Sequence, residues 1–170
     1  MESGIISSIF DTLSKDVTIQ YFLRVGTKPN DISIVVVGHL LLEYLMNRII
    51  ELKCKSPKKI IEDSRNYPFS VKLQIIYSMG LLPDYIFNNI AKMNKIRNGL
   101  AHDLDFHERE IDRTIFVLSG KKVCPKPKGR GNPRTYYFKT LALETINQLR
   151  SHMETNLQIP TEAKEFNPFK

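Results

Sequence analysis

Hydrophobic residues recur at the spacing of an α-helix in several segments of the chain. An amphipathic segment begins close to the N-terminus, and a second helical piece follows it up to a break at residues 26–29. The apolar positions of these two pieces are Ile5, Ile6, Ile9, Phe10, Leu13, Val17, Ile19, Phe22 and Leu23. The longest segment runs from Ile32 to about Leu52, with Asp31 as its N-cap. Because it is apolar on most sides, it is predicted to be the central buried helix.

Two further helices are predicted on either side of a turn at Gly80. Apolar positions from Phe69 to Tyr77 mark a short helix, which Gly80 closes as its C′ residue. Pro83 fits the first turn of the next helix, which is expected to run to about His102. The preceding residues 58–67 are charged and only weakly helical in pattern.

The last third of the chain predicts two more helices. Ile111, Ile115 and Leu118 indicate a helix that Gly120 closes. After a basic loop, Tyr136–Phe138 allows a short strand, but the apolar spacing favours a final helix. That spacing is formed by Phe138, Leu141, Ala142, Ile146, Leu149 and Met153. From Leu157 onwards the sequence is polar, and we expect it to be frayed.

No internal repeat and no other sustained strand pattern is visible, so we expect an all-α fold. A chain of 170 residues suits one domain. The predicted architecture is therefore a single-domain helical bundle of five to six helices over residues 1–156. Within it, the helical core occupies residues 31–119 and the basic loop occupies residues 121–135. Residues 157–170 are expected to form a flexible C-terminal tail.

The positive charge of the chain is concentrated in the basic loop. The formal net charge is +7, and six positive charges without an acid fall in this loop. They belong to Lys121, Lys122, Lys126, Lys128, Arg130 and Arg134. A basic loop on a nearly neutral body favours attraction to a polyanion, RNA first and DNA second. A solvated loop without a partner explains the same charges equally well.

Cysteine usage and the longest apolar run indicate the compartment. Cys54 and Cys124 are far apart and lack the paired spacing of a zinc site, which favours a reducing compartment and predicts no metal. The N-terminus lacks the basic region of a signal peptide. The apolar run from Ile32 to Leu42 is too short to span a bilayer. We therefore expect a soluble, cytoplasmic protein.

The side chains best suited to chemistry lie together on the predicted helix that ends near His102. At about 100° per residue, Arg97, Asn98 and His102 share an arc of about 140° on that helix. The arc borders an apolar face formed by Ile86, Ile90, Met93 and Leu100. Such a position is partly desolvated, and a partly desolvated Arg and His interact strongly with a phosphate group.

Arg97 and His102, separated by four residues of which the first is Asn98, resemble the signature of the HEPN superfamily. In that family an Arg is followed by a His after four to six residues. The context is also similar: a long apolar helix bearing Glu43, a turn at residues 78–82, and then the motif helix. This order resembles the HEPN families related to the mannitol operon repressor, and the resemblance covers roughly residues 31–119.

The combination of Arg97, Asn98 and His102 suits a reaction in which the substrate supplies its own nucleophile. Cleavage of RNA by its 2′-hydroxyl is such a reaction, since it needs proton transfer from His and charge stabilisation from Arg. No metal and no cofactor is required in principle. We therefore expect a metal-independent endoribonuclease, with Glu43 as a supporting carboxylate.

The HEPN resemblance implies how a single His per chain suffices for both proton transfers. In HEPN ribonucleases two motifs meet across a two-fold dimer interface, so the resemblance implies a homodimer. A mixed stripe on the motif helix suits such a contact: Phe87, Ala91, Asn94, Asn98 and His102. The biological setting expected is a toxin–antitoxin pair or antiviral defence, with an antitoxin or a nucleotidyltransferase-like partner. Leu104 stands where one HEPN subgroup carries a Tyr that such a partner modifies.

Structural roles remain as alternatives for each residue. Arg97 could form a salt bridge with Asp103 or Glu43, and His102 could cover the carbonyls at the helix end. Glu43 needs a partner if it is buried, and an Arg or His of the motif helix is the expected one. His39, four residues before Glu43, is interpreted as half of a structural hydrogen-bonded pair. The alternative function is a non-catalytic HEPN-fold interaction module or a repressor-like regulator.

The basic loop generates the first prediction. Replacing Lys126, Lys128, Arg130 and Arg134 by Ala should weaken RNA binding and flatten its dependence on salt concentration, because fewer counterions are released. The melting temperature should hardly change. Binding titrations at several salt concentrations check this, and an unchanged salt slope would make the loop a solvated connector.

Overall fold

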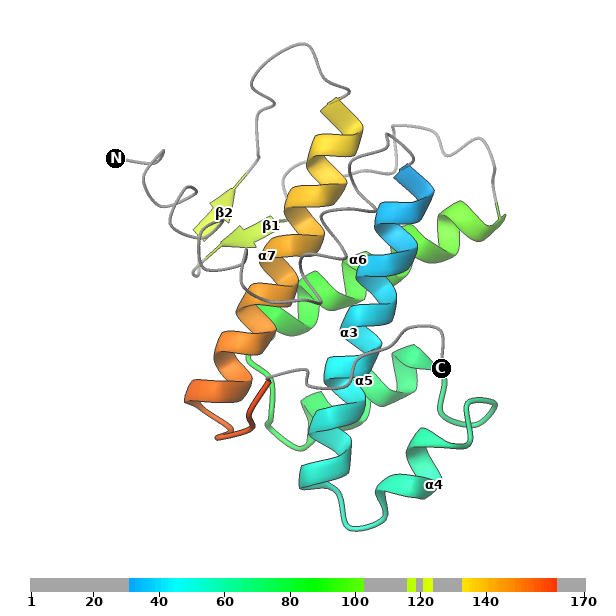
Figure 1. Cartoon of the computed structure of the whole chain (residues 1–170), viewed down its shortest axis with the longest axis vertical. Helices are drawn as coiled ribbons and strands as arrows, with labels where there is room; N and C mark the ends of the chain where they lie inside the picture. The colour runs from blue at the N-terminus through cyan, green and yellow to red at the C-terminus, as the bar shows by residue number, and fades with distance from the viewer. Residues whose placement is uncertain (1–30, 103–115, 119–120, 124–132, 162–170) are drawn as a thin grey trace.

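A computed structural model describes residues 31–102, 116–118, 121–123 and 133–161 of the chain. These residues form five helices and one small β-hairpin (Figure 1). Helices α3 (Asp31–Lys53) and α7 (Pro133–Thr155), each of 23 residues, lie side by side. Helix α6 (Asp84–His102) packs against both. The described part is therefore all-helical apart from the hairpin, as the sequence predicts.

Helix α3 is the centre of the structure, and its predicted boundaries are confirmed within one residue. It contacts α4 (Pro57–Ile61), α5 (Phe69–Ser78), α6 and α7. Its buried residues, 5 % exposed or less, are Val35, Leu41, Leu42, Leu45, Met46, Ile49 and Ile50. A helix that is apolar on most sides needs this coverage, because packing against several partners removes most of its apolar surface from water. Val36, Leu40 and Leu52 of α3 remain exposed.

The turn between α5 and α6 has the geometry that the sequence predicts. Gly80 has a φ of 70°, in the left-handed region that favours glycine. Its N–H donates to the carbonyl of Tyr77, and the N–H of Leu81 donates to that of Ile76. These two bonds form a Schellman motif, which satisfies the last carbonyls of α5. The motif ends α5 and redirects the chain into α6.

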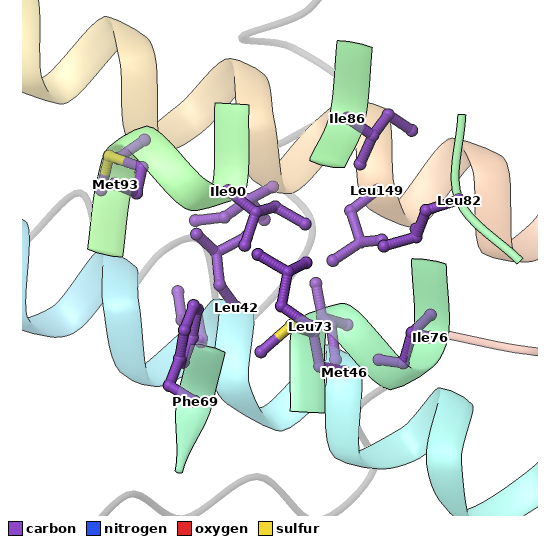
Figure 2. Packing of buried hydrophobic residues seen from close by; sticks show 14 of the residues in the cluster. Leu42, Met46, Phe69, Leu73, Ile76, Leu82, Ile86, Ile90, Met93 and Leu149 are labelled. Atoms are coloured by element: carbon purple, nitrogen blue, oxygen red, sulfur yellow. The ribbon is translucent and has the colours of Figure 1, made fainter. Parts of the chain in front are cut away.

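Helix α6 buries the predicted apolar face. Ile86, Ile90 and Met93 are fully buried, and Ile96 is nearly so. They meet side chains of α3, α5 and α7 in one continuous core (Figure 2). Since the turns of α6 from Ile86 to Ile96 contribute to this core, the rotation of that part of the helix about its own axis is fixed. The direction in which the following motif residues leave the helix is fixed with it.

The hairpin corrects the helix that was predicted to end at Gly120. Phe116–Leu118 forms β1, which pairs antiparallel with β2 (Lys121–Val123) and places Leu118 opposite Lys121. Two residues, one of them Gly120, separate the strands, a length typical of hairpins. A run of aromatic and β-branched residues beside such a turn favours strands over a helix. Ile111 and Ile115 lie outside the described residues.

Residues Tyr136–Phe138, for which the sequence allowed either a short strand or a helix, are helical in the structure. Both tyrosines belong to α7, which begins at Pro133, so the strand reading is wrong. Proline is favoured in the first turn of a helix because its missing N–H has no partner there in any case.

The segment after α7 is packed at its beginning. The N–H of Ile159 donates to the carbonyl of Met153 at 2.8 Å, and the Ile159 side chain is buried in the core. The Thr161 hydroxyl donates to Glu154 and accepts from Nε of Arg150. Fraying from Leu157 is therefore wrong for residues 157–161, because Ile159 has a core position to fill. The remainder of the predicted tail and both predicted N-terminal helices lie outside the described residues.

No helix in the described ranges is long and apolar enough to cross a membrane.

The Gly80 turn generates the second prediction. Gly80→Ala should lower the free energy of unfolding by about 1–2 kcal/mol, because a side chain is strained in the left-handed region. Gly80→Asn should cost less, since Asn tolerates this region better. Chemical denaturation measures both. Ser78→Ala, two residues earlier in the exposed last turn of α5, is the control and should have little effect.

Candidate functional site

The predicted catalytic residues occupy the last two turns of α6. Arg97 and Asn98 are exposed, and Nη1 of Arg97 donates a hydrogen bond to Oδ1 of Asn98 at 3.0 Å. His102 is the last residue of the helix, one turn beyond Asn98. The three residues therefore belong to one continuous helix, as predicted. Met93 and Ile96 beside them are buried, so Arg97 stands at the border of the core.

Arg97 has no described carboxylate partner. The ion pairs among the described residues are Arg48–Glu51 and Lys72–Glu43. The alternative in which Arg97 pairs with Glu43 is therefore wrong. The other alternative, Asp103, lies outside the described residues. Within the described part of the chain, the guanidinium presents its charge on the surface with only an amide as its hydrogen-bond partner.

Glu43 pairs with Lys72 of α5 rather than with the motif helix. Nζ of Lys72 lies 3.0 Å from Oε1 of Glu43, and the lysine side chain is only 3 % exposed against 31 % for the glutamate. A buried ammonium group needs a close anion, because desolvation of an unpaired ion costs several kcal/mol. Glu43 thus neutralises Lys72 and remains partly open to solvent.

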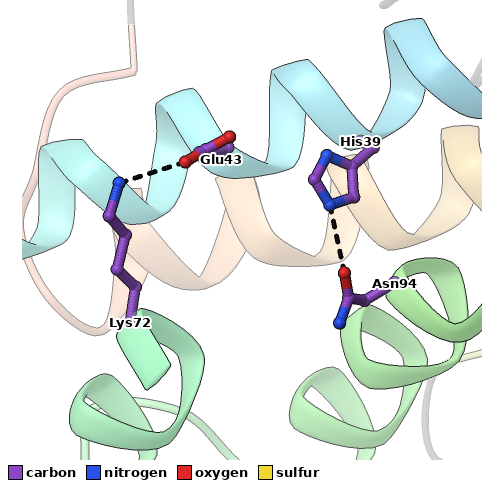
Figure 3. Close-up of polar contacts among 4 residues, drawn as sticks. All are labelled: His39, Glu43, Lys72 and Asn94. Carbon is purple, nitrogen blue, oxygen red and sulfur yellow. Dashed lines mark hydrogen bonds and ion pairs between the residues drawn. The ribbon is translucent and has the colours of Figure 1, made fainter. Parts of the chain in front are cut away.

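His39 is bound to α6 through Asn94. Its Nε2 lies 3.2 Å from Oδ1 of Asn94 (Figure 3). Its ring stacks on Phe69 with the centroids 4.1 Å apart. The residue is 7 % exposed. Since the Asn94 atom is an acceptor, Nε2 of His39 carries a proton and donates it. A structural pair of His39 with Glu43, four residues further on, is therefore wrong, since His39 binds Asn94 and Glu43 binds Lys72.

The pKa of His39 lies below its ordinary value of 6.5, mainly because burial disfavours the charged ring. The hydrogen bond to Asn94 opposes this effect and raises the pKa. The positive charge of Arg97 lowers the pKa further, and the carboxylate of Glu43 raises it. Both charges therefore act on the ring.

We call His39, Glu43, Lys72, Asn94 and Arg97 together the His39 cluster. Three helices supply it: α3 gives His39 and Glu43, α5 gives Lys72, and α6 gives Asn94 and Arg97. Figure 3 shows the first four of these side chains, without Arg97. Sequence reasoning missed Lys72 and Asn94. The spacing of Asn94, three and four residues before Arg97 and Asn98, was the available signal, since such residues share a helix face.

The mixed stripe of α6 is partly occupied within the chain. Phe87 packs against the Tyr77 ring with the centroids 4.3 Å apart, and Asn94 binds His39. Asn98 remains exposed and Ala91 is partly exposed.

The basic residues predicted to bind RNA fall in different settings. Lys121 and Lys122 belong to β2, opposite Leu118 and Val117 of β1. Arg134 belongs to the first turn of α7. Lys126, Lys128 and Arg130 lie outside the described residues. In the described part of the chain, no group of three or more His, Cys, Asp or Glu side chains could hold a metal ion.

Comparisons with protein-family models, with curated proteins and with solved structures gave no match. The HEPN resemblance therefore depends on the residues of the motif and on their order along the chain.

The charges around His39 generate the third prediction. Arg97→Gln removes a cation that lowers the pKa of His39, so the pKa should rise. Glu43→Gln removes a carboxylate that raises it and leaves Lys72 unpaired, so the pKa should fall further. NMR titration of the His39 ring protons measures both shifts. Arg48→Gln, which removes an exposed arginine from α3, is the control and should leave the pKa unchanged.

The lowered pKa of His39 determines how the free energy of unfolding depends on pH. The unfolded chain binds the proton near pH 6.5, while folded His39 resists it, so unfolding takes up a proton between these two pKa values. The contribution of His39 to the free energy of unfolding is full above pH 6.5 and is lost as the pH falls towards the folded pKa. Chemical denaturation of wild type and His39→Gln at several pH values isolates this contribution.

In the NMR titrations, shifts of the His39 pKa in the same direction in Arg97→Gln and Glu43→Gln would contradict the arrangement of charges around the ring.

Proposed function

We propose that this protein is a metal-independent endoribonuclease of the HEPN type, with Arg97 and His102 as catalytic residues and Asn98 beside them. The observation that carries the proposal is the exposed Arg97. Its guanidinium has no described carboxylate partner, and it stands on the same two helical turns as His102. An exposed guanidinium with no carboxylate partner in the described part of the chain favours a phosphate group over any uncharged ligand.

The proposed reaction transfers protons between the RNA and the protein without a covalent intermediate. A histidine removes the proton from a ribose 2′-hydroxyl, and that oxygen attacks the adjacent phosphorus. Arg97 stabilises the negative charge of the phosphorane as it forms. The bond from phosphorus to the 5′-oxygen then breaks, and this oxygen takes a proton from a second group. The products are a 2′,3′-cyclic phosphate and a free 5′-hydroxyl.

The second proton-transfer group is proposed to be His102 of a second copy of the chain. A symmetric contact through α6 brings two such helices together, and exposed Asn98 is available for it. The proposed setting is a toxin or defence effector restrained by a partner protein. The basic loop is proposed to guide the RNA.

The dimer is the fourth prediction. Light scattering on purified protein should give about twice the chain mass of 19.7 kDa, because one histidine per chain serves as base or acid but not both. A monomer at a protein concentration of roughly tens of micromolar, the range in which a weak interface still forms, would contradict a site built from two chains.

Cleavage itself is the fifth prediction. The wild type should cut single-stranded RNA in excess EDTA, and DNA of the same sequence should survive. His102→Ala should lower the rate by about 10²–10⁴-fold through loss of proton transfer. Arg97→Ala should lower it by about 10²–10³-fold through loss of charge stabilisation. Both variants should keep the melting temperature, since substitutions of polar residues outside the core seldom dominate stability, and Arg97 is exposed.

Matched variants sharpen this assay. Arg97→Lys keeps the charge but loses the planar fork, so its rate should lie between wild type and Arg97→Ala. Arg48→Ala removes a comparably exposed arginine from α3 and should cut like the wild type. If pure dimer cuts no RNA, the non-catalytic interaction module replaces the nuclease. Cleavage that depends on magnesium would support the assignment as a nuclease but would contradict the proposed metal-independent mechanism.

A further inference from the structure

We propose that His39 is a positioning residue for Arg97, acting through Asn94. Its catalytic consequence rests on the proposed nuclease function, whereas its structural consequence does not. At 7 % exposure His39 is too enclosed to meet a substrate directly. Its hydrogen bond instead holds the turn of α6 that carries Arg97, three residues after Asn94.

The contacts of His39 fix both ends of this connection. The ring, which belongs to α3, stacks on Phe69 of α5 with an interplanar angle of 28°. On the other side it holds the amide of Asn94 at 3.2 Å. This hydrogen bond joins α3 to α6 at a residue that lies three positions before Arg97. It therefore reaches α6 shortly before the end of the helix, where ends otherwise fray.

The connection also requires His39 to be neutral. A second positive charge beside Arg97 would repel the guanidinium that it is meant to hold. The charged groups that act on the ring are Glu43 of α3 and Arg97 of α6. Lys72 neutralises Glu43, which weakens the pull of that carboxylate on a proton for His39. Burial and the nearby Arg97 both favour the uncharged ring.

Two substitutions of His39 separate positioning from general stability. In His39→Gln the side-chain amide nitrogen can take the place of Nε2 and donate to Asn94. In His39→Leu the side chain is still bulky, but it has no hydrogen-bond donor for Asn94. We expect kcat to fall about tenfold or more in His39→Leu with little change in KM, and to stay within about threefold of wild type in His39→Gln. Loss of a transition-state contact lowers kcat in this way.

A purely structural role gives a different pattern. The kinetics are measured at a temperature where all variants are folded, as circular dichroism establishes. If His39→Leu cuts like wild type, or if His39→Gln loses as much activity as His39→Leu, the positioning role is refuted. If His39→Leu does not fold, Asn94→Ala takes its place, because it removes the same hydrogen bond from a partly exposed residue.

An NMR measurement on the Arg97 side chain tests this inference independently of nuclease activity. The side-chain Nε–Hε resonance of Arg97 should shift and broaden in His39→Leu and in Asn94→Ala, but not in His39→Gln. The corresponding resonance of Arg48 is the internal control. If wild type cuts no RNA while Arg97 responds as described, the nuclease proposal fails and the positioning role stands. If Arg97 does not respond in either variant, the positioning role fails whatever the activity.

Discussion

Burial of α3 on most of its circumference is the constraint on which the rest of the described structure depends. A helix of 23 residues with so many apolar side chains is stable only when several partners cover it. Helices α5, α6 and α7 supply this cover, and each fully buried Leu or Ile contributes about 1.5–3 kcal/mol relative to exposure. The crossing of these helices follows from that packing.

The same constraint explains the polar residues of the His39 cluster. His39 and Glu43 lie one turn apart on α3, at the side where α5 and α6 approach (Figure 3). Each polar group enclosed there needs a partner, because an unsatisfied one costs about 1–3 kcal/mol. Asn94 serves His39, and Glu43 serves the deeply buried Lys72. Arg97 lies just outside this enclosed zone, close enough to act on His39 and exposed enough to meet a ligand.

Local patterns were sufficient to predict most of the described helices. The ends of α3, the left-handed Gly80 and the buried face of α6 follow from apolar spacing and from the chemistry of single residues. The placement of Arg97, Asn98 and His102 on one helix follows from the same spacing. These features need no knowledge of which elements meet in space.

The partners of the polar residues were not predictable in this way. Whether Glu43 meets Lys72 or Arg97 depends on how α5 and α6 cross α3, which helical periodicity does not encode. Ile159 was missed because the few apolar residues of the polar tail, such as Leu157 and Ile159, follow no helical period. The hairpin was missed because three-residue strands are too short for alternation to appear.

The most direct measurement of the central claim uses RNA substrates that differ at one atom. The nucleotide 5′ to a mapped cleavage position is replaced by its 2′-deoxy counterpart, and cleavage is followed in excess EDTA. If the substrate supplies the nucleophile, cleavage at that position should disappear while cleavage elsewhere in the same strand continues. Unchanged cleavage at the 2′-deoxy position would contradict the proposed chemistry of Arg97 and His102.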